Sequence, residues 1–183
     1  AVEHDTMDTT FRSMYLGLSA FLDANTERRE LLLGQRPPRF DSSFDEAIAQ
    51  AGDDFERVAL KAQAARDYFL LVGPPGTGKT SRALRRMVEH FYATSSMQIL
   101  LLAYTNRAVD EICQSLSSIT PGIDYIRVGS ELSCDVRFRG HLLENILAEC
   151  NSRREVNTRM TDCRVYVGTV ASIAAKAELF KLK

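Results

Sequence analysis

The sequence has 183 residues, of which 45% are hydrophobic and 26% are charged, and its formal net charge is −1. These values are typical of a globular domain and exclude a protein whose whole surface attracts nucleic acid, although a local basic groove is compatible with them. No apolar run approaches the ~20 residues that cross a bilayer, and the N-terminus lacks the pattern of a secretory signal. We therefore expect a cytoplasmic protein without a membrane partner.

The first part of the chain carries helical patterns that a proline-rich segment interrupts. Residues 8–33 have apolar side chains at helical spacing, and Gly34 follows as a C-cap. The segment QRPPRFDSS then breaks the pattern, because neither Pro37 nor Pro38 can continue a helix. Helical spacing returns at residues 44–51 and again at 55–62, with an aspartate N-cap at position 53 or 54.

From Tyr68 onwards the pattern changes to strands that alternate with helices. The run YFLLVG, residues 68–73, is continuously apolar and predicts a buried parallel strand. Further strands are predicted at QILLLAY, DYIRVG and CRVYVGT, and helices at 79–93, 106–117, 139–150 and from 171. This alternation predicts an α/β fold with a mostly parallel sheet and helices on both faces. We assign residues 1–52 to an N-terminal helical segment and linker, and 53–183 to the α/β domain.

The segment GPPGTGKT matches the phosphate-loop pattern G-x-x-x-x-G-K-[ST] between a predicted strand and a predicted helix. Its glycines allow backbone N–H groups to surround phosphates, and the helix N-terminus favours the same anion. Lys79 is expected to reach the β- and γ-phosphates of ATP, and Thr80 to offer its hydroxyl to Mg²⁺. The predicted nucleotide-binding residues are Gly73, Pro74, Pro75, Gly76, Thr77, Gly78, Lys79, Thr80 and Ser81.

The phosphate loop alone does not distinguish helicases from AAA+ machines or other ATPases. The segment that follows it, ILLLAYTNRAVDEICQSL, is more specific, because it resembles motif Ia of superfamily 1 helicases. It is similar in particular to the branch that includes the nonsense-mediated-decay RNA helicase and the Okazaki-fragment nuclease-helicase. RDYFLLVGPPGTGKT also resembles the phosphate loop of the latter. The resemblance implies a RecA-like domain of an ATP-dependent helicase, and it covers about residues 53–176.

The resemblance also implies which residues contact nucleic acid. In this branch the residues at the end of the second strand, here Thr105 and Asn106, contact the backbone of a single strand. DYIRVGS and VYVGTVAS resemble the branch's motifs Ib and Ic, and the second implies a further backbone contact by Thr169. The alternative is that Thr105 and Thr169 only cap helices, since threonine is a favoured N-cap. Backbone contacts carry no base information, so RNA is not excluded, although the resemblance favours DNA.

One departure from the branch concerns adenine recognition. These helicases usually carry a glutamine in the helix before the first strand, and its amide reads the adenine edge. The nearest glutamine here, Gln63, lies one to two turns beyond the corresponding position. Adenine selectivity through that amide is therefore not expected.

The sequence offers no acid for a Walker B site, which needs an apolar strand ending in Asp-Glu after the phosphate loop. Asp45-Glu46 precedes the loop, and Asp110-Glu111 lies within a predicted helix, where a solvated role is expected. We therefore expect the front portion of the first RecA-like domain of a larger helicase, truncated before the Walker B strand. Such a piece, monomeric by expectation, is predicted to bind ATP weakly without useful turnover. The alternatives are an AAA+ ATPase or a non-catalytic nucleotide-binding module.

Overall fold

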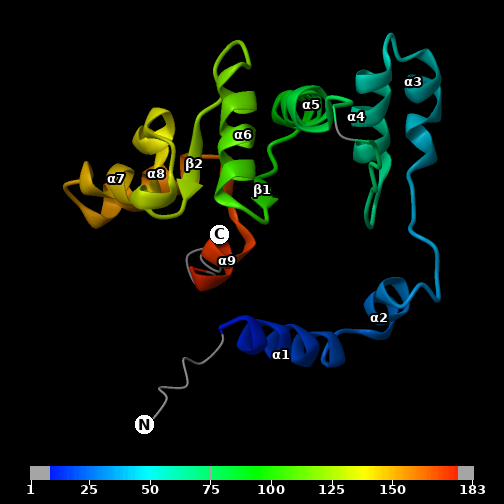
Figure 1. Cartoon of the computed structure of the whole chain (residues 1–183). Helices are drawn as coiled ribbons and strands as arrows, with labels where there is room; N and C mark the ends of the chain where they lie inside the picture. Colours follow the sequence, from blue (N-terminus) through cyan, green and yellow to red (C-terminus); the bar gives the residue numbers. More distant parts are fainter. Residues whose placement is uncertain (1–8, 75, 177–183) are drawn as a thin grey trace.

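The computed structural model describes residues 9–74 and 76–176. Its N-terminal part is helical, and its C-terminal part is built around a small parallel sheet (Figure 1). The N-terminal elements are α1 (Thr9–Leu22), α2 (Thr26–Leu32), η1 (Ser42–Phe44), α3 (Asp45–Gln50) and α4 (Asp54–Ala64). The later helical elements are η2 (Lys79–Leu84), α5 (Arg85–Thr94), α6 (Asn106–Ser117), η3 (Glu131–Ser133), η4 (Val136–His141), α7 (Leu143–Ala148), α8 (Arg153–Asp162) and α9 (Val170–Ala175).

The single helix predicted over residues 8–33 is wrong, because two helices form there. The side chain of Asn25 accepts a hydrogen bond from the N–H of Arg28 at 2.8 Å and so caps the start of α2. The predicted C-cap is one residue off, because the C-cap of α2 is Leu33; Gly34 follows it with a φ of 69°, a conformation that disfavours other residues.

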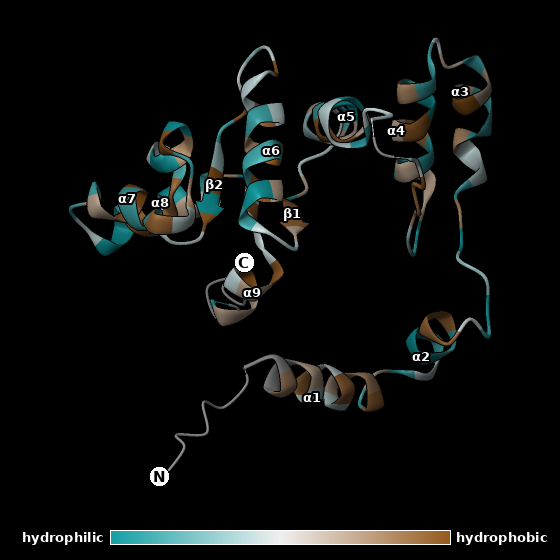
Figure 2. Cartoon of the chain, viewed as in Figure 1, coloured by the Kyte–Doolittle hydropathy of each residue, from teal (hydrophilic) through white to brown (hydrophobic). Residues whose placement is uncertain are grey.

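The first helix is apolar and exposed. Figure 2 shows hydrophobic residues around much of α1, and Figure 1 shows α1 apart from the sheet. Phe11 and Tyr15 on this helix are 70% and 73% exposed. In the described part of the chain, no helix combines the length and apolar character that crossing a membrane requires.

An ionic clamp ties the proline-rich segment to the residues just before the phosphate loop. The carboxylate of Asp67 accepts hydrogen bonds from Arg36 Nη1 at 2.9 Å and from Arg39 Nη2 at 3.0 Å. These guanidinium groups, Arg36 first, hold the pKa of Asp67 well below its usual range. A single antiparallel bridge between Phe40 and Ala65 adds a backbone contact. The segment is therefore an ordered part of the structure.

The sheet contains β1 (Ile99–Ala103), β2 (Tyr125–Val128) and β3 (Val165–Thr169) in the order β1-β3-β2, with all pairs parallel. These strands confirm three of the four predicted from the sequence. The register pairs Ala103 with Thr169, so β1 and β3 end at the same edge of the sheet.

Helices cover both faces of the sheet, as predicted. Val165 and Val167 pack into a cluster with the apolar stripe of α6, whose members are Val109, Ile112, Cys113 and Leu116. Tyr166 and Ile126 point to the other face, where they pack with residues of α7 and α9. The alternation along β3 therefore builds two apolar clusters, and all five of its residues are buried.

The strand predicted at residues 68–73 does not form. This run has no regular secondary structure, and Leu70 and Val72 are 75% and 92% exposed. A strand needs a partner for its N–H and C=O groups. No described residue pairs with this run, and β1 pairs with β3 alone among the described strands. An apolar run indicates that a segment can be buried, but it does not supply the neighbouring strand.

Candidate nucleotide and nucleic-acid site

The phosphate loop has the backbone that its glycines predict. Gly76 and Gly78 have φ values of 82° and 81°, and η2 begins immediately afterwards at Lys79. This left-handed conformation disfavours side chains, so glycine is required at both positions. The N–H groups of the first helical turn have no carbonyl partner within the helix. η2 and α5 together confirm the helix predicted to follow.

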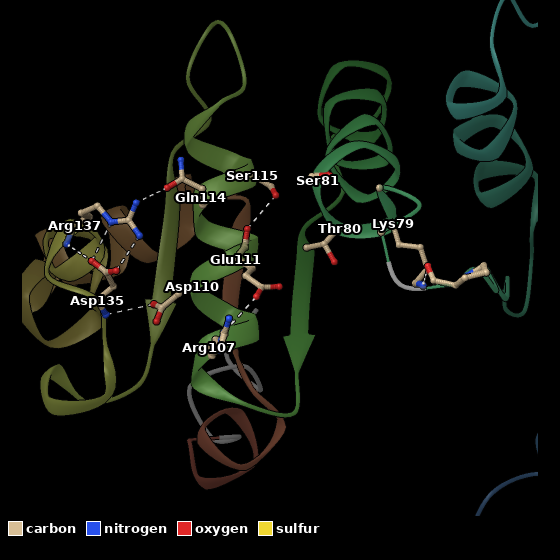
Figure 3. A pocket seen from close by; sticks show the side chains of 13 residues that line it. Lys79, Thr80, Ser81, Arg107, Asp110, Glu111, Gln114, Ser115, Asp135 and Arg137 are labelled. Atoms are coloured by element: carbon tan, nitrogen blue, oxygen red, sulfur yellow. Dashed lines mark hydrogen bonds and ion pairs between the residues drawn. The ribbon is translucent and has the colours of Figure 1, made fainter.

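Lys79 is bound to its own loop. Its ammonium group donates to the carbonyl oxygen of Gly73 and, at 2.9 Å, to that of Pro74. Thr77 Oγ1 donates to the same Pro74 oxygen at 2.8 Å. Figure 3 shows Lys79 directed away from α6. Pro75, one of the predicted binding residues, lies outside the described residues.

A cavity of about 740 Å³ lies between the loop and α6 (Figure 3). It brings together six of the nine predicted nucleotide-binding residues: Pro74, Gly76, Gly78, Lys79, Thr80 and Ser81. Gly73 and Thr77 lie outside this lining and approach each other, since a Cβ on Gly73 would come within 3.0 Å of Thr77 Oγ1. The remaining walls come from polar side chains of α6 and from two residues near η4.

The described residues only partly fit a magnesium ion. Thr80 offers a hydroxyl to the cavity, and Asp110 and Glu111 line the same space. However, Asp110 binds Arg127, and Glu111 lies 3.7 Å from the guanidinium group of Arg107. Among the described residues, no three His, Cys, Asp or Glu side chains form a group that could hold a metal. We therefore assign Thr80 as a single candidate ligand.

The expectation that Asp110 is merely solvated is wrong. Its carboxylate pairs with the guanidinium group of Arg127, whose side chain is 1% exposed. Arg127 also donates to the carbonyl of Ser133 at 3.3 Å, and the N–H of Asp135 lies 3.4 Å from Asp110. A buried guanidinium group requires such partners. The contacts join α6, β2 and the segment before η4.

The predicted nucleic-acid residues gather at the carboxyl edge of the sheet. Thr105 follows β1 and accepts a hydrogen bond from the N–H of Ala108 at 3.2 Å, which caps α6. Thr169 ends the neighbouring strand β3 and accepts from the N–H of Ser172 at 3.1 Å, which caps α9. Both threonines therefore cap helices, and their contact with nucleic acid stays a prediction. Asn106 lies beside Thr105 in the first turn of α6 and is exposed.

The two threonines differ in accessibility. Thr105 is exposed, whereas Thr169 is 7% exposed and its hydroxyl also donates to Ser172 Oγ at 2.8 Å. At Thr105 the edge still presents the N–H groups of the first turn of α6, which can hold an anion. The α6 end of this edge is therefore better suited to bind a phosphate than the Thr169 end.

Gln63 has a partner within the protein. Its Oε1 atom is hydrogen-bonded to His90 Nε2, which joins α4 to α5. Burial lowers the pKa of His90, and the nearby Arg86 charge acts in the same direction. The amide is therefore used in packing between helices, in line with the departure noted in the sequence.

One helix, α8, and the burial of one residue, Arg127, were not predicted from the sequence. The helix α8 has no apolar stripe, but it begins with a capping box that could have revealed it: Ser152 accepts from the N–H of Glu155 at 3.2 Å, and Glu155 accepts from the N–H of Asn151 at 2.7 Å. Arg127 carries no local signal of its burial.

Comparison with known proteins identifies the family. The AAA_11 family model, described as an AAA domain, matches residues 50–178. The DNA replication ATP-dependent helicase/nuclease JHS1 of Arabidopsis thaliana is 34% identical over 138 residues, which are 69% of this chain and 10% of JHS1. The DNA replication ATP-dependent helicase/nuclease DNA2 of Homo sapiens is 33% identical over 113 residues, 55% of this chain and 10% of DNA2. The RNA helicase Mov10l1 of Mus musculus is 29% identical over 106 residues, 57% of this chain and 8% of Mov10l1.

The chain thus spans 10% or less of the length of these three relatives. The family match covers most of the chain, and the parallel sheet with a glycine-rich loop before a helix agrees with a P-loop NTPase fold. This chain therefore belongs to the AAA_11 family of AAA domains, and it is similar to a part of the ATP-dependent helicases JHS1 and DNA2.

Proposed function

We propose that this chain is part of an ATP-dependent helicase, with the triphosphate of ATP held at residues 73–81 and a single strand held at the carboxyl edge of the sheet. The observation that carries the proposal is the pair of left-handed glycines, Gly76 and Gly78, directly before a helix that begins with Lys79. This backbone surrounds an anion with N–H groups. The helicase names of the relatives support the same function.

In this proposal Lys79 leaves the carbonyls of Gly73 and Pro74 and binds the β- and γ-phosphates. Thr80 contributes its hydroxyl to Mg²⁺, and the ion would neutralise phosphate charge during transfer. All three carboxylates that line the cavity pair with arginines: Asp110, Glu111 and Asp135. Residues 9–74 and 76–176 alone are therefore proposed to bind ATP without useful turnover, whereas the whole helicase hydrolyses it.

The contact with the single strand is proposed at Thr105 and Asn106, and Thr169 is proposed to contribute less to the binding free energy. An N-terminal helix turn and an exposed amide can hold the sugar–phosphate backbone without reading bases. We favour DNA over RNA, because JHS1 and DNA2 are named as DNA replication enzymes, although Mov10l1 is named as an RNA helicase. We also propose that the protein is monomeric and cytoplasmic.

The nucleotide half is tested by replacing Lys79. Lys79→Ala removes the ammonium group and should weaken ATP binding at least tenfold, as measured by equilibrium binding of a fluorescent ATP analogue. Lys61→Ala is the matched control, because Lys61 lies on α4 and is exposed. Equal affinity for ATP in Lys79→Ala and the parent protein would refute the nucleotide site.

The strand half is tested by Thr105→Ala together with Asn106→Ala, which should weaken single-strand binding several-fold and leave ATP affinity nearly unchanged. The loss of a helix cap is a separate effect of about 1 kcal/mol on stability. Ser152→Ala controls for it, because Ser152 caps α8 in the same way. Strand binding that is unchanged in the double variant would exclude this edge. In the whole protein, ATP turnover that does not respond to added strands would favour an AAA+ machine.

A further inference from the structure

The face of β1 that points away from α6 is apolar and only partly covered by the described residues. Its side chains, Leu100 and Leu102, are 47% and 45% exposed. Their register partners in β3 lie under helices: Tyr166 is buried with residues of α7 and α9. A Cβ on Gly168 would come within 3.1 Å of Ile173 in α9. The helices on this face therefore cover β2 and β3 and leave β1 open.

The first helix carries an apolar stripe that has no partner among the described residues. Phe11, Tyr15, Leu18 and Leu22 recur at helical spacing along one side of α1, and each is at least 57% exposed. None of the described side chains of α1 is buried. Leaving such a stripe in water forfeits the favourable free energy of burial. One chain thus holds an open sheet face and an apolar helix of the kind that covers such faces.

A short segment joins α1 to a fixed part of the molecule. Only residues 23–25 separate it from α2 (Figure 1). The helix α2 is tied to the ionic clamp, because Glu27 pairs with Arg39 at 2.7 Å and its carbonyl oxygen accepts a hydrogen bond from Arg36 Nε at 3.2 Å. A rotation at residues 23–25 therefore moves α1, which is about 21 Å long, and leaves α2 in place.

We propose that α1 is a strap that closes over β1, with its apolar stripe on Leu100 and Leu102. A tethered helix is present at a millimolar effective concentration, so it meets this face far more often than a separate protein does. The closed strap lies beside Ala103, where β1 reaches the carboxyl edge of the sheet. Its effect on function rests on the strand site proposed above: the open state admits the single strand, and the closed state limits its access.

The competing occupant of β1 is a segment of the remaining helicase, because the chain spans 10% or less of the length of the three relatives. The two occupants differ in where they place α1. A strap brings its stripe into contact with Leu102, whereas another segment on β1 keeps α1 away from that residue.

The first experiment is crosslinking in the whole protein, with Leu18→Cys in the α1 stripe and Leu102→Cys on β1. A short bismaleimide should join the tryptic peptides 13–28 and 87–107, as read by mass spectrometry. The matched control pairs Leu18→Cys with Ser117→Cys, because Ser117 is an exposed residue of α6 on the other face of the sheet. Closure predicts about tenfold more linked product for the first pair. Equal yields for the two pairs would overturn the strap.

A double-mutant cycle supplies the second measurement. Leu18→Ser and Leu102→Ser each remove part of the proposed contact, so each should lower the melting temperature, and the two effects should not add. Leu32→Ser is the matched control, since Leu32 is 63% exposed on α2, and its effect should add to that of Leu102→Ser. Small and additive effects of Leu18→Ser and Leu102→Ser would also overturn the strap.

The affinity for a fluorescein-labelled oligothymidylate, measured by anisotropy, tests the effect on the strand site separately. Leu18→Ser should open the strap and raise this affinity by the reciprocal of the open fraction. Crosslinking in the parent pair with unchanged affinity in Leu18→Ser would keep the strap and overturn its control of the strand. A protein that crosslinks but binds no oligonucleotide would overturn the strand site and leave the strap in place.

Discussion

The sheet with α6 and the approach to the phosphate loop are stabilised in different ways. All five residues of β3 are buried, and α6 packs a full apolar stripe against the sheet. Residues 68–73 have an equally apolar sequence, yet Leu70 and Val72 are largely exposed. The described contacts that position this approach are polar, chiefly the clamp of Asp67 with Arg36 and Arg39.

The difference shows that apolar composition does not by itself decide burial. β3 has a strand on each side, so its backbone groups are satisfied and its side chains meet helices on both faces. The run at 68–73 has no such neighbours among the described residues. Four experiments test this contrast, beginning with the one for which we expect the largest effect.

Truncating leucines in the two regions should give opposite results. Leu116→Ala in α6 removes a side chain that is 1% exposed and should lower the free energy of unfolding by about 2–5 kcal/mol. Leu70→Ala removes one that is 75% exposed and should change it by less than about 0.5 kcal/mol. Urea denaturation followed by circular dichroism measures both. Similar losses for the two variants would mean that the approach is buried in solution.

Breaking the ion pair beneath α6 should be the next largest effect. Asp110→Ala leaves the buried Arg127 guanidinium without its carboxylate and should cost about 3 kcal/mol of stability, the lower end for such pairs because Asp110 is 23% exposed. The double variant Asp110→Leu/Arg127→Met removes both charges and should recover at least half of that loss. If the double variant were no more stable than Asp110→Ala, the stability loss in Asp110→Ala would not come from the unpaired charge of Arg127.

The clamp at Asp67 should control access to the proline-rich segment. Asp67→Asn removes the carboxylate charge and should speed trypsin cleavage after Arg39, while Asp54→Asn, whose carboxylate is exposed and pairs with Arg57, should not. The clamp of the parent protein should also weaken in acid. The folded-state pKa of Asp67 lies below the unfolded value of about 3.9, so the clamp stabilises the fold fully above that pH. This stabilisation is lost as the pH falls toward the folded-state pKa. The rate of cleavage by pepsin, measured across this pH range, should rise as the clamp is lost. Equal trypsin cleavage rates for the parent protein and both variants would show that the clamp does not protect the proline-rich segment.

The smallest effect should appear in thiol reactivity. Burial raises the pKa of the Cys113 thiol to about 11, so roughly one molecule in a thousand is thiolate at pH 8. Cys150 is only partly buried, and neither thiol is in a disulfide. Iodoacetamide labelling read by peptide mass spectrometry should therefore modify Cys150 well before Cys113. Equal labelling rates in the folded protein would show that the α6 core opens readily.

Local patterns predicted the elements that depend on nearby residues. The bounds of α6, the N-cap at Asp53 and the three strands of the sheet follow from apolar spacing and capping chemistry within a few residues. The loop conformation followed from its glycines. These features could be read from the sequence because their causes lie within the same short segment.

The features that were missed depend on distant partners. The burial of Arg127 requires Asp110, which is 17 residues away, and the absence of a strand at 68–73 depends on which strands lie beside β1. The break at Asn25 is an exception, since an asparagine N-cap is a local signal.

The contacts of Lys79 also bear on which anions the loop would bind most strongly. Its ammonium group is shared by two carbonyl oxygens of the loop, so under the proposed function the capture of a triphosphate would be an exchange in which phosphate oxygens replace these carbonyl oxygens. The ammonium group keeps its charge, but its hydrogen bonds to the carbonyls have to be replaced, so an anion gains only the difference between the two sets of contacts. We therefore expect the loop to favour a triphosphate over a single phosphate, because the more highly charged anion gains more from binding the same lysine.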